Sequence, residues 1–338
     1  MRAAVYTGNS KLDVRDVPVP EVGPNEVLVE VACCAICGTD VHAVMYDVAP
    51  PGTVLGHEYS GKVVKVGSDI TGWQVGDRVV GGGGNPPPGK GKGWDLDPRY
   101  NYRLHGFDPD RMRAYAEYVI MEEWEPIPIP DGVSYESAAL CEPAAVAVHA
   151  VRLSQLRLGD TVTVIGAGPI GLFTIQAARA AGATSILVSE PSATRRAAAE
   201  ALDADIVIDP TQEDPVKAAE DMTSGAGVHG VLDCAGIKGS HDQAANMVRT
   251  RGQVVLIAVP WEPLPLEPAD WMARHINIQT IFGHEPADWH TVLKLMQTRK
   301  ILVEPMLRES DFVPLENIQS AFESLYTPGD QLQLVVRP

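Results

Sequence analysis

Two groups of residues in this chain have types and spacings that could do chemistry. The first comprises Cys37 and His57, each beside a glycine, with Glu58 directly after the histidine. Cysteine, histidine and carboxylate are the ligands of catalytic zinc, which keeps a fourth position open for water or substrate. The second group is the run Gly166-Ala167-Gly168-Pro169-Ile170-Gly171, which follows a β-branched stretch and precedes an alanine-rich one. In that context, glycines at this spacing are typical of a dinucleotide site.

Each glycine of the run has a separate predicted role in binding a dinucleotide. Gly166 permits a tight turn, Gly168 lets the backbone approach the pyrophosphate, and Gly171 allows close packing of helix on strand. The helix that begins with Pro169 and Ile170 directs unpaired backbone N–H groups and the positive end of its dipole toward the phosphates. The cofactor predicted here is NAD or NADP.

Glu190 is expected to bind the adenine ribose of that cofactor. It lies 190 − 171 = 19 residues after the last glycine, close to the usual distance of about 20 residues for the acidic group that binds the ribose hydroxyls. A carboxylate there repels the additional phosphate of NADP, so NAD is favoured. Arg195 and Arg196 leave NADP as the alternative, because a guanidinium could hold a 2′-phosphate.

Alternating patterns predict the elements that position both groups. Apolar strands are expected at residues 161–165, 185–189, 205–208, 230–233, 253–259 and 277–282, with helices between them, which describes an α/β fold with a doubly wound parallel sheet. Val259 and Phe282 end the last two strands and are expected to flank the nicotinamide ring. Residues before about 130 form short β-like runs, and residues 331–336 return to this pattern. The predicted domains are 1–147 together with 300–338, and 148–299.

Composition excludes several classes of function. The chain has 338 residues, and 27 basic against 44 acidic residues give a net charge of −17, which disfavours binding to nucleic acid or to an anionic membrane surface. No stretch reaches the 18 apolar residues of a membrane span, and no apolar signal segment begins the chain. Five irregularly spaced cysteines indicate a reducing compartment, so we expect a cytoplasmic protein.

These residues, together with Val63-Val64-Lys65-Val66-Gly67 and Gly76-Asp77-Arg78-Val79, resemble the zinc-dependent medium-chain dehydrogenase/reductase family over essentially the whole chain. The resemblance implies a GroES-like irregular β domain beside a Rossmann domain. The run from Glu142 to Ala150 is similar to the polyol, butanediol and threonine dehydrogenase branch, which implies Glu142 as the third zinc ligand beside Cys37 and His57. Cys141 is the alternative, because classical alcohol dehydrogenases use a cysteine in this region.

The reaction implied by the resemblance is hydride transfer between a secondary alcohol, diol or polyol, or the matching ketone, and NAD(H). It assigns Thr39 and His42 to a relay that carries the hydroxyl proton outward, roles suited to a hydroxyl and an imidazole. Asp40 is expected to accept the other ring N–H of His57 and keep it oriented. Glu58 has two open roles, as an additional zinc ligand or as a charge that balances the site.

One departure from the family concerns residues 81–110, which contain no cysteine, so a structural zinc is expected to be absent. We expect Tyr46, Trp94, Trp261 and Trp271 to contribute to the substrate pocket, and a homodimer or homotetramer follows from the resemblance. Two alternatives remain at this point. One is a zinc-free enone or quinone reductase of the same superfamily, and the other is a non-catalytic NAD-binding structural protein.

Overall fold

The computed structural model describes residues 1–85, 87, 111–260, 266, 268–327 and 329–338. The chain forms two compact units. The β unit comprises Met1–Glu142, Arg308–Gly329 and Gln333–Pro338, and the parallel-sheet unit comprises Pro143–Leu307 and Asp330–Leu332. The predicted domain edges at 147/148 and 299/300 differ from this division. The difference arises because helix α4 (Cys141–Leu153) continues through the first predicted edge, and η2 (Glu304–Met306) still belongs to the parallel-sheet unit.

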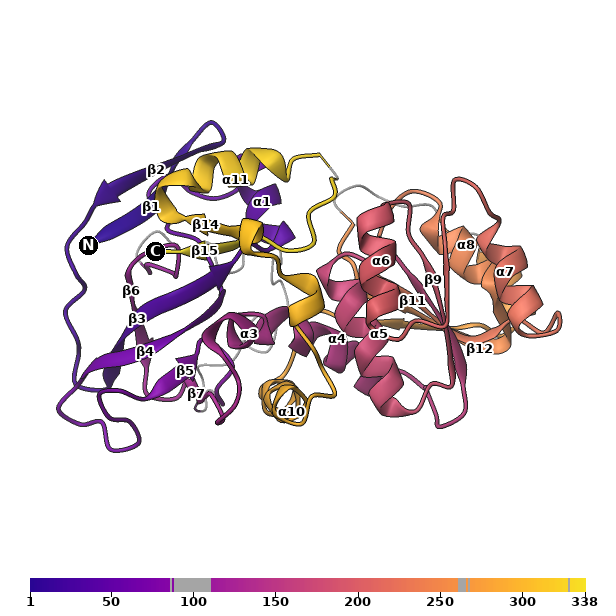
Figure 1. Cartoon of the computed structure of the whole chain (residues 1–338), viewed down its shortest axis with the longest axis horizontal. Helices are drawn as coiled ribbons and strands as arrows, with labels where there is room; N and C mark the ends of the chain where they lie inside the picture. Colours follow the sequence, from indigo (N-terminus) through magenta and orange to yellow (C-terminus); the bar gives the residue numbers. More distant parts are fainter. Residues whose placement is uncertain (86, 88–110, 261–265, 267, 328) are drawn as a thin grey trace. The chain divides into compact units, whose positions relative to one another are not determined.

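The β unit is built on a seven-stranded sheet with the order β14-β15-β3-β4-β5-β7, in which β6 also pairs with β3. Its strands are β3 (Glu26–Ala35), β4 (Glu58–Val66), β5 (Arg78–Val80), β6 (Tyr118–Glu122), β7 (Ile127–Pro128), β14 (Phe312–Pro314) and β15 (Val335–Arg337), and β1 (Arg2–Gly8) with β2 (Lys11–Asp16) forms a separate hairpin. Strand β15 pairs antiparallel with β3, so the C-terminal segment returns to the first unit as expected (Figure 1).

Short helices complete the β unit: α1 (Gly38–Met45), α3 (Tyr135–Ala139), η3 (Glu309–Asp311), η4 (Leu315–Asn317) and α11 (Ile318–Ser324). The core contains Tyr6, Tyr115 and Phe322, which are fully buried. The rings of Tyr115 and Phe322 meet edge to face with centroids 5.7 Å apart, a favourable geometry for an aromatic pair. Tyr115 therefore joins this core to the site described below.

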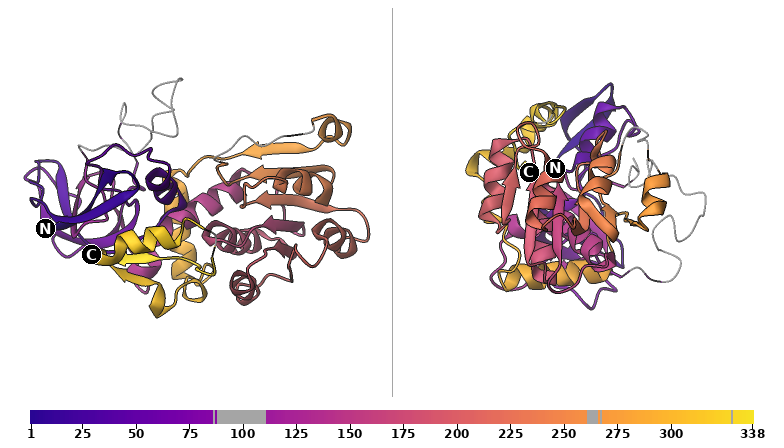
Figure 2. Two further views of the ribbon diagram at one scale, coloured as in Figure 1. Left: turned by 90° about the horizontal axis from the view of Figure 1, so that it is seen from above. Right: turned by 90° about the vertical axis from the view of Figure 1, so that its right-hand side faces the viewer.

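The parallel-sheet unit has six parallel strands in the order β10-β9-β8-β11-β12-β13. They are β8 (Thr161–Ile165), β9 (Ser185–Ser189), β10 (Ile206–Ile208), β11 (Val228–Asp233), β12 (Val248–Leu256) and β13 (Asn277–Thr280). This order confirms the predicted doubly wound sheet, whose strand sequence reverses direction between β8 and β11. Figure 2 shows these strands side by side, from magenta to orange.

Helices connect the parallel strands: α5 (Pro169–Ala181), α6 (Ala193–Ala201), α7 (Pro215–Met222), α8 (Ser240–Met247) and α9 (Pro268–Ala273), with α10 (Pro286–Gln297) after the last strand. Figure 1 shows α5 and α6 on one side of the sheet and α7 and α8 on the other. Both faces of the sheet are thus covered, which explains its continuous apolar strands. Across the described residues, no helix combines the length and the apolar character required to traverse a bilayer.

Candidate metal centre and cofactor site

The pairing of β3 with β4 brings two of the predicted metal ligands, Cys37 and His57, together with Glu58. The antiparallel register ends at the pair Ala35↔Glu58, so Cys37, two residues beyond Ala35, lies beside His57, one residue before Glu58. Gly56 has a φ of +99°, and a Cβ there would lie 2.9 Å from the backbone nitrogen of Tyr115. Only glycine satisfies both constraints, so the backbone before His57 is fixed by its neighbours.

Ligand atoms of Cys37, His57 and Glu58 all lie within 4.8 Å of one another. Of the two roles left open for Glu58, this geometry favours that of a ligand. Among the described residues, Glu142 is not part of this group. It is nevertheless close enough for its charge to raise the pKa of both Glu58 and Cys37. The structure thus places one carboxylate inside the group and a second at its margin.

The electrostatics of the group fit a bound cation. Burial, followed by the charge of Glu142, raises the pKa of Glu58 to about 8, and its Oε2 is buried without a hydrogen-bond partner. Burial and the neighbouring Glu58 raise the pKa of the Cys37 thiol to about 11. Buried carboxylates need a partner charge, and thiolate, imidazole and carboxylate together form a zinc donor set. The residues present therefore fit the metal that the sequence predicts.

Asp40 lies where it can orient the histidine. Its Oδ1 is 3.3 Å from Nδ1 of His57, which leaves Nε2 for a metal. Burial lowers the pKa of His57, but the charges of Asp40 and Cys37 outweigh this effect and raise it well above its usual value. The Tyr115 hydroxyl donates a hydrogen bond of 2.8 Å to the other oxygen of Asp40. Sequence reasoning missed Tyr115, because it lies 75 residues further along the chain in a run without a motif.

Helix α1 carries Thr39 and His42 three residues apart, which places them on one face. Cys37 is the N-cap, and its Sγ accepts a hydrogen bond of 3.4 Å from the backbone N–H of Thr39. Thr39 is exposed and His42 is partly buried, with its ring stacked on Tyr46 at 5.8 Å. Burial lowers the pKa of His42, so its imidazole is neutral at neutral pH and can accept a proton.

The four aromatic residues expected at the substrate pocket differ in their exposure and in whether the structure describes them. Trp94 and Trp261 lie outside the described residues. Tyr46 is 53% exposed, whereas Trp271 is 4% exposed and belongs to the hydrophobic core of the parallel-sheet unit. The prediction for Trp271 is therefore wrong, because an indole packed among aliphatic side chains presents no surface to a substrate.

In the turn between β8 and α5, each of the three glycines has a different structural environment. Gly166 has a φ of +86°, and a Cβ at Gly171 would lie 2.0 Å from the carbonyl oxygen of Gly166. Gly168 differs, because its φ is −68° and a Cβ there would meet no protein atom within 4 Å. The protein itself does not require this glycine, so the open space fits the close approach of a pyrophosphate. Gly168 also provides no side-chain cap for α5, which leaves the helix N–H groups near Pro169 and Ile170 available to phosphates.

Glu190 follows β9 and fixes this turn. It is 3% exposed, and its two carboxylate oxygens accept hydrogen bonds from the backbone N–H groups of Ala167 at 2.7 Å and Ser192 at 2.8 Å. The two arginines nearby are engaged with the protein. Arg195 donates to the carbonyl oxygen of Gln331, and Arg196 donates to the carbonyl oxygens of Glu190 and Pro191 and pairs with Asp209.

Val259 and Phe282 lie just beyond the carboxyl ends of β12 and β13. They are 40% and 39% exposed, and their place at this edge of the sheet is the one from which doubly wound folds contact their ligands. Their predicted contact with the nicotinamide ring stays a prediction.

Each of the two units matches a known protein domain. Residues 23–131 match the alcohol dehydrogenase GroES-like domain, and residues 169–298 match the zinc-binding dehydrogenase domain. The chain is 32% identical to (R,R)-butanediol dehydrogenase of Bacillus subtilis (strain 168), over 100% of each chain. It is 30% identical to human sorbitol dehydrogenase, over 98% of this chain and 94% of that protein. A solved structure from Sinorhizobium meliloti 1021, described as a zinc-binding dehydrogenase bound to NADP, superposes with a TM-score of 0.89 at 31% identity, over 100% and 99% of the two chains.

Proposed function

The chain belongs to the zinc-dependent medium-chain dehydrogenase/reductase family, and from this we propose that it transfers hydride between a secondary alcohol, diol or polyol and NAD. The observation that carries the proposal is the group of Cys37, His57 and Glu58, whose donor atoms lie within 4.8 Å of one another. The same chain contains the glycine turn at 166–171, where a Cβ at Gly168 would meet no protein atom within 4 Å. The similarity to butanediol and sorbitol dehydrogenases supports a substrate with a secondary hydroxyl.

Cys37 and His57 would hold the zinc, with a carboxylate as the third ligand. Glu58 is favoured for that position because its Oε2 is buried and unpartnered, and Glu142 is the second candidate. A bound zinc acts as a Lewis acid and lowers the pKa of a coordinated hydroxyl. Asp40 holds the imidazole of His57 in the required orientation through its Nδ1, and Tyr115 holds Asp40.

The proton released on oxidation needs acceptors, and helix α1 provides two. The hydroxyl of Thr39 can accept a proton while donating its own, and His42, whose pKa is lowered by burial, can take it up and deliver it to water. The position of both residues on one face of α1 supports this relay.

NAD is the proposed cofactor, with NADP as the alternative. A buried carboxylate at Glu190 repels a 2′-phosphate. Arg195 and Arg196 already contact carbonyl oxygens of the protein, and Arg196 also pairs with Asp209, so neither guanidinium is reserved for a 2′-phosphate. The relative from Sinorhizobium meliloti, which binds NADP, makes a direct comparison of the two cofactors necessary.

We also propose a homodimer or homotetramer in the cytoplasm. Strand β13 is at an edge of the parallel sheet and exposes Ile278 to 47%, which is a surface suited to pairing with another copy. All five cysteines are free, as expected in a reducing compartment. Light scattering of the purified protein checks the association.

The substitution Cys37→Ser tests the proposal, with Cys33→Ser as the matched control. Both cysteines lie near the end of β3 and both thiols have a pKa raised to about 11 by burial, but Cys33 is outside the metal group. Loss of bound zinc and of NAD reduction in Cys37→Ser alone, with NAD affinity retained, is the expected result. Full turnover in zinc-free Cys37→Ser protein would refute the proposal in favour of a zinc-free reductase, and no turnover by the wild type with any alcohol would favour a structural protein.

A further inference from the structure

A hollow lies in the parallel-sheet unit, mostly toward the amino ends of its strands. It has a volume of about 220 Å³ and is lined by the segment after α4 and by residues of β8, β11 and β12, from near the starts of these strands to Leu232 and Val255. Because the strands are parallel, the glycine turn is at their carboxyl ends, whereas Arg157, Asp160 and Arg249 lie at or before the amino ends of β8 and β12. This hollow, called the arginine pocket below, is therefore separate from the proposed cofactor site.

Three arginines line the arginine pocket: Arg157, Arg249 and Arg251. Several other arginines of this acidic chain are paired with carboxylates, as in the pairs Arg152–Asp288 and Arg274–Asp270. Within the described residues, no carboxylate or carbonyl oxygen pairs with any of the three guanidiniums. Unpaired guanidiniums of residues that line one hollow provide planar, charged donors suited to an oxyanion.

Two further groups in the arginine pocket offer donors. Gln253 is 6% exposed, and its Oε1 accepts a hydrogen bond of 2.6 Å from the backbone N–H of Gln155. This contact fixes the amide so that Nε2 is the free group, and no hydrogen bond from it is made to the described residues. His229 Nδ1 accepts from the backbone N–H of Thr161 at 3.1 Å, so its proton is on Nε2.

Asp160 is the one acidic group among the lining residues. Its Oδ1 is 3.6 Å from His229 Nε2, and its Oδ2 accepts from the backbone N–H of Arg157. Three guanidiniums against one carboxylate leave the arginine pocket positive in a protein whose net charge is −17. Exposed guanidiniums and a buried amide in one hollow provide charged and neutral donors for a small anion.

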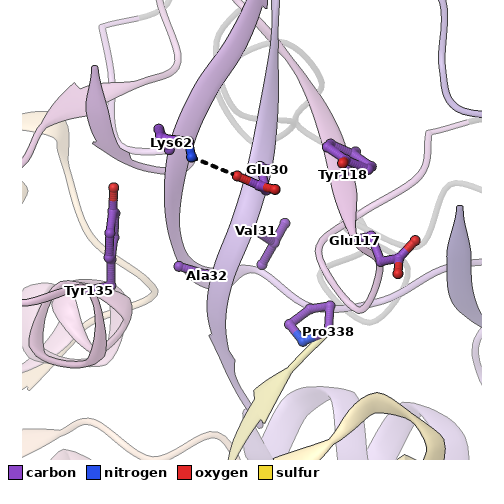
Figure 3. Close-up of a pocket in the computed structure, with 8 residues that line it drawn as sticks. All are labelled: Glu30, Val31, Ala32, Lys62, Glu117, Tyr118, Tyr135 and Pro338. Atoms are coloured by element: carbon purple, nitrogen blue, oxygen red, sulfur yellow. Dashed lines mark ion pairs between the residues drawn. The ribbon is translucent and has the colours of Figure 1, made fainter. Parts of the chain in front are cut away.

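A hollow in the β unit provides a contrast. It has a volume of about 230 Å³ and is lined by Glu30, Lys62, Glu117 and Tyr135, among others (Figure 3). There the Lys62 ammonium is 2.9 Å from Glu30, and Glu117 is paired with Arg2 at 2.9 Å. Its charges are thus neutralised by the protein, whereas those of the arginine pocket are not.

We propose that the arginine pocket binds a small multivalent oxyanion, inorganic phosphate or the phosphate group of a small metabolite. Arg249 and Arg251 contact the anion, with Gln253 Nε2 as a further donor. A nucleic acid does not fit, because the charge of the remaining chain repels a long polyanion.

The test is calorimetric titration of the zinc-loaded protein with inorganic phosphate at low ionic strength, with saturating NAD to occupy the glycine turn. The variant is Arg251→Gly and the matched control is Arg299→Gly. Both arginines are exposed residues of the same unit with positive φ, +62° and +57°, so glycine fits each backbone and both variants are expected to fold. Arg299 is paired with Glu304 and does not line the pocket.

Saturable binding by the wild type and by Arg299→Gly, weakened roughly tenfold or more in Arg251→Gly, is the expected result, since one charged hydrogen-bonding partner is lost. Equal weakening in the two variants would mean that phosphate responds only to net charge, and would overturn the proposal. Absence of saturable binding to the wild type would do the same, as would a single-stranded oligonucleotide that binds where phosphate does not. Phosphate together with glucose 6-phosphate in parallel titrations separates the free ion from a phosphorylated metabolite.

Discussion

The pair Gly168→Ala and Gly171→Ala separates a glycine needed for the cofactor from one needed for the fold. A Cβ at position 168 meets no protein atom within 4 Å, and the φ of −68° and ψ of −176° suit alanine. Reduced unfolded-state entropy stabilises Gly168→Ala by about 0.4–1 kcal/mol, and the poorer N-cap costs a similar amount. We therefore expect its thermal midpoint to stay close to that of the wild type, while its Kd for NAD rises about tenfold or more, equivalent to about 1.4 kcal/mol.

Gly171→Ala should show the opposite behaviour. Its Cβ would lie 2.0 Å from the carbonyl oxygen of Gly166, whereas Cβ atoms in proteins almost never approach another heavy atom closer than 3.0 Å. Helix α5 must therefore move away from β8. Overpacking of this kind costs about 1–3 kcal/mol or more, which corresponds to a midpoint lowered by about 2–12 °C for a unit of this size. Differential scanning calorimetry and NAD titration of each variant measure the two effects. Unchanged NAD affinity in Gly168→Ala would refute the assignment of that space to the pyrophosphate.

Three further substitutions test other parts of the structure. Glu190→Ala should raise kcat/KM with NADP relative to NAD, because the charge that repels the 2′-phosphate is removed; an unchanged ratio would mean that the ribose is recognised elsewhere. His42→Asn should lower kcat about tenfold or more and remove the acid limb of its pH profile; an unaltered profile would exclude the imidazole from the relay. Burial raises the pKa of Asp288, but hydrogen bonds from His149 and Arg152 outweigh this and lower it to about 2. This fully buried carboxylate therefore contributes about 2 kcal/mol of stability that is present above about pH 4 and lost as the pH falls toward 2. Urea unfolding should show Asp288→Asn destabilised at pH 7 and less sensitive to acid, and equal acid sensitivity in both proteins would contradict the pairing.

Much of the fold was predictable because its signals are local. The β-branched run of β8, the glycine turn and the alanine-rich start of α5 are contiguous, so the periodicity of the chain and the stereochemistry of glycine identify a doubly wound sheet directly. Cys37 and His57 were identified from residue type and from short local motifs, and for His57 the preceding Gly56 is required by its positive φ. The place of Glu190 at the end of β9 was predicted from a spacing within one βαβ unit, where the lengths of strand and helix vary little, and its contact with the ribose stays a prediction.

Residues far apart in the chain required the tertiary structure. The sequence left Glu58 with two roles and preferred Glu142 as a ligand by resemblance, whereas the register Ala35↔Glu58 brings Glu58 beside Cys37 and His57. Tyr115 supports Asp40 from another segment, and the arginine pocket is assembled from residues of three strands and of the segment after α4. Among these, Glu58 and Gln253 lie in strands, and a one-residue shift in register would turn their side chains to the other face. The sequence by itself therefore determined which residues can carry out the chemistry, and long-range pairing of the strands decided which of them meet.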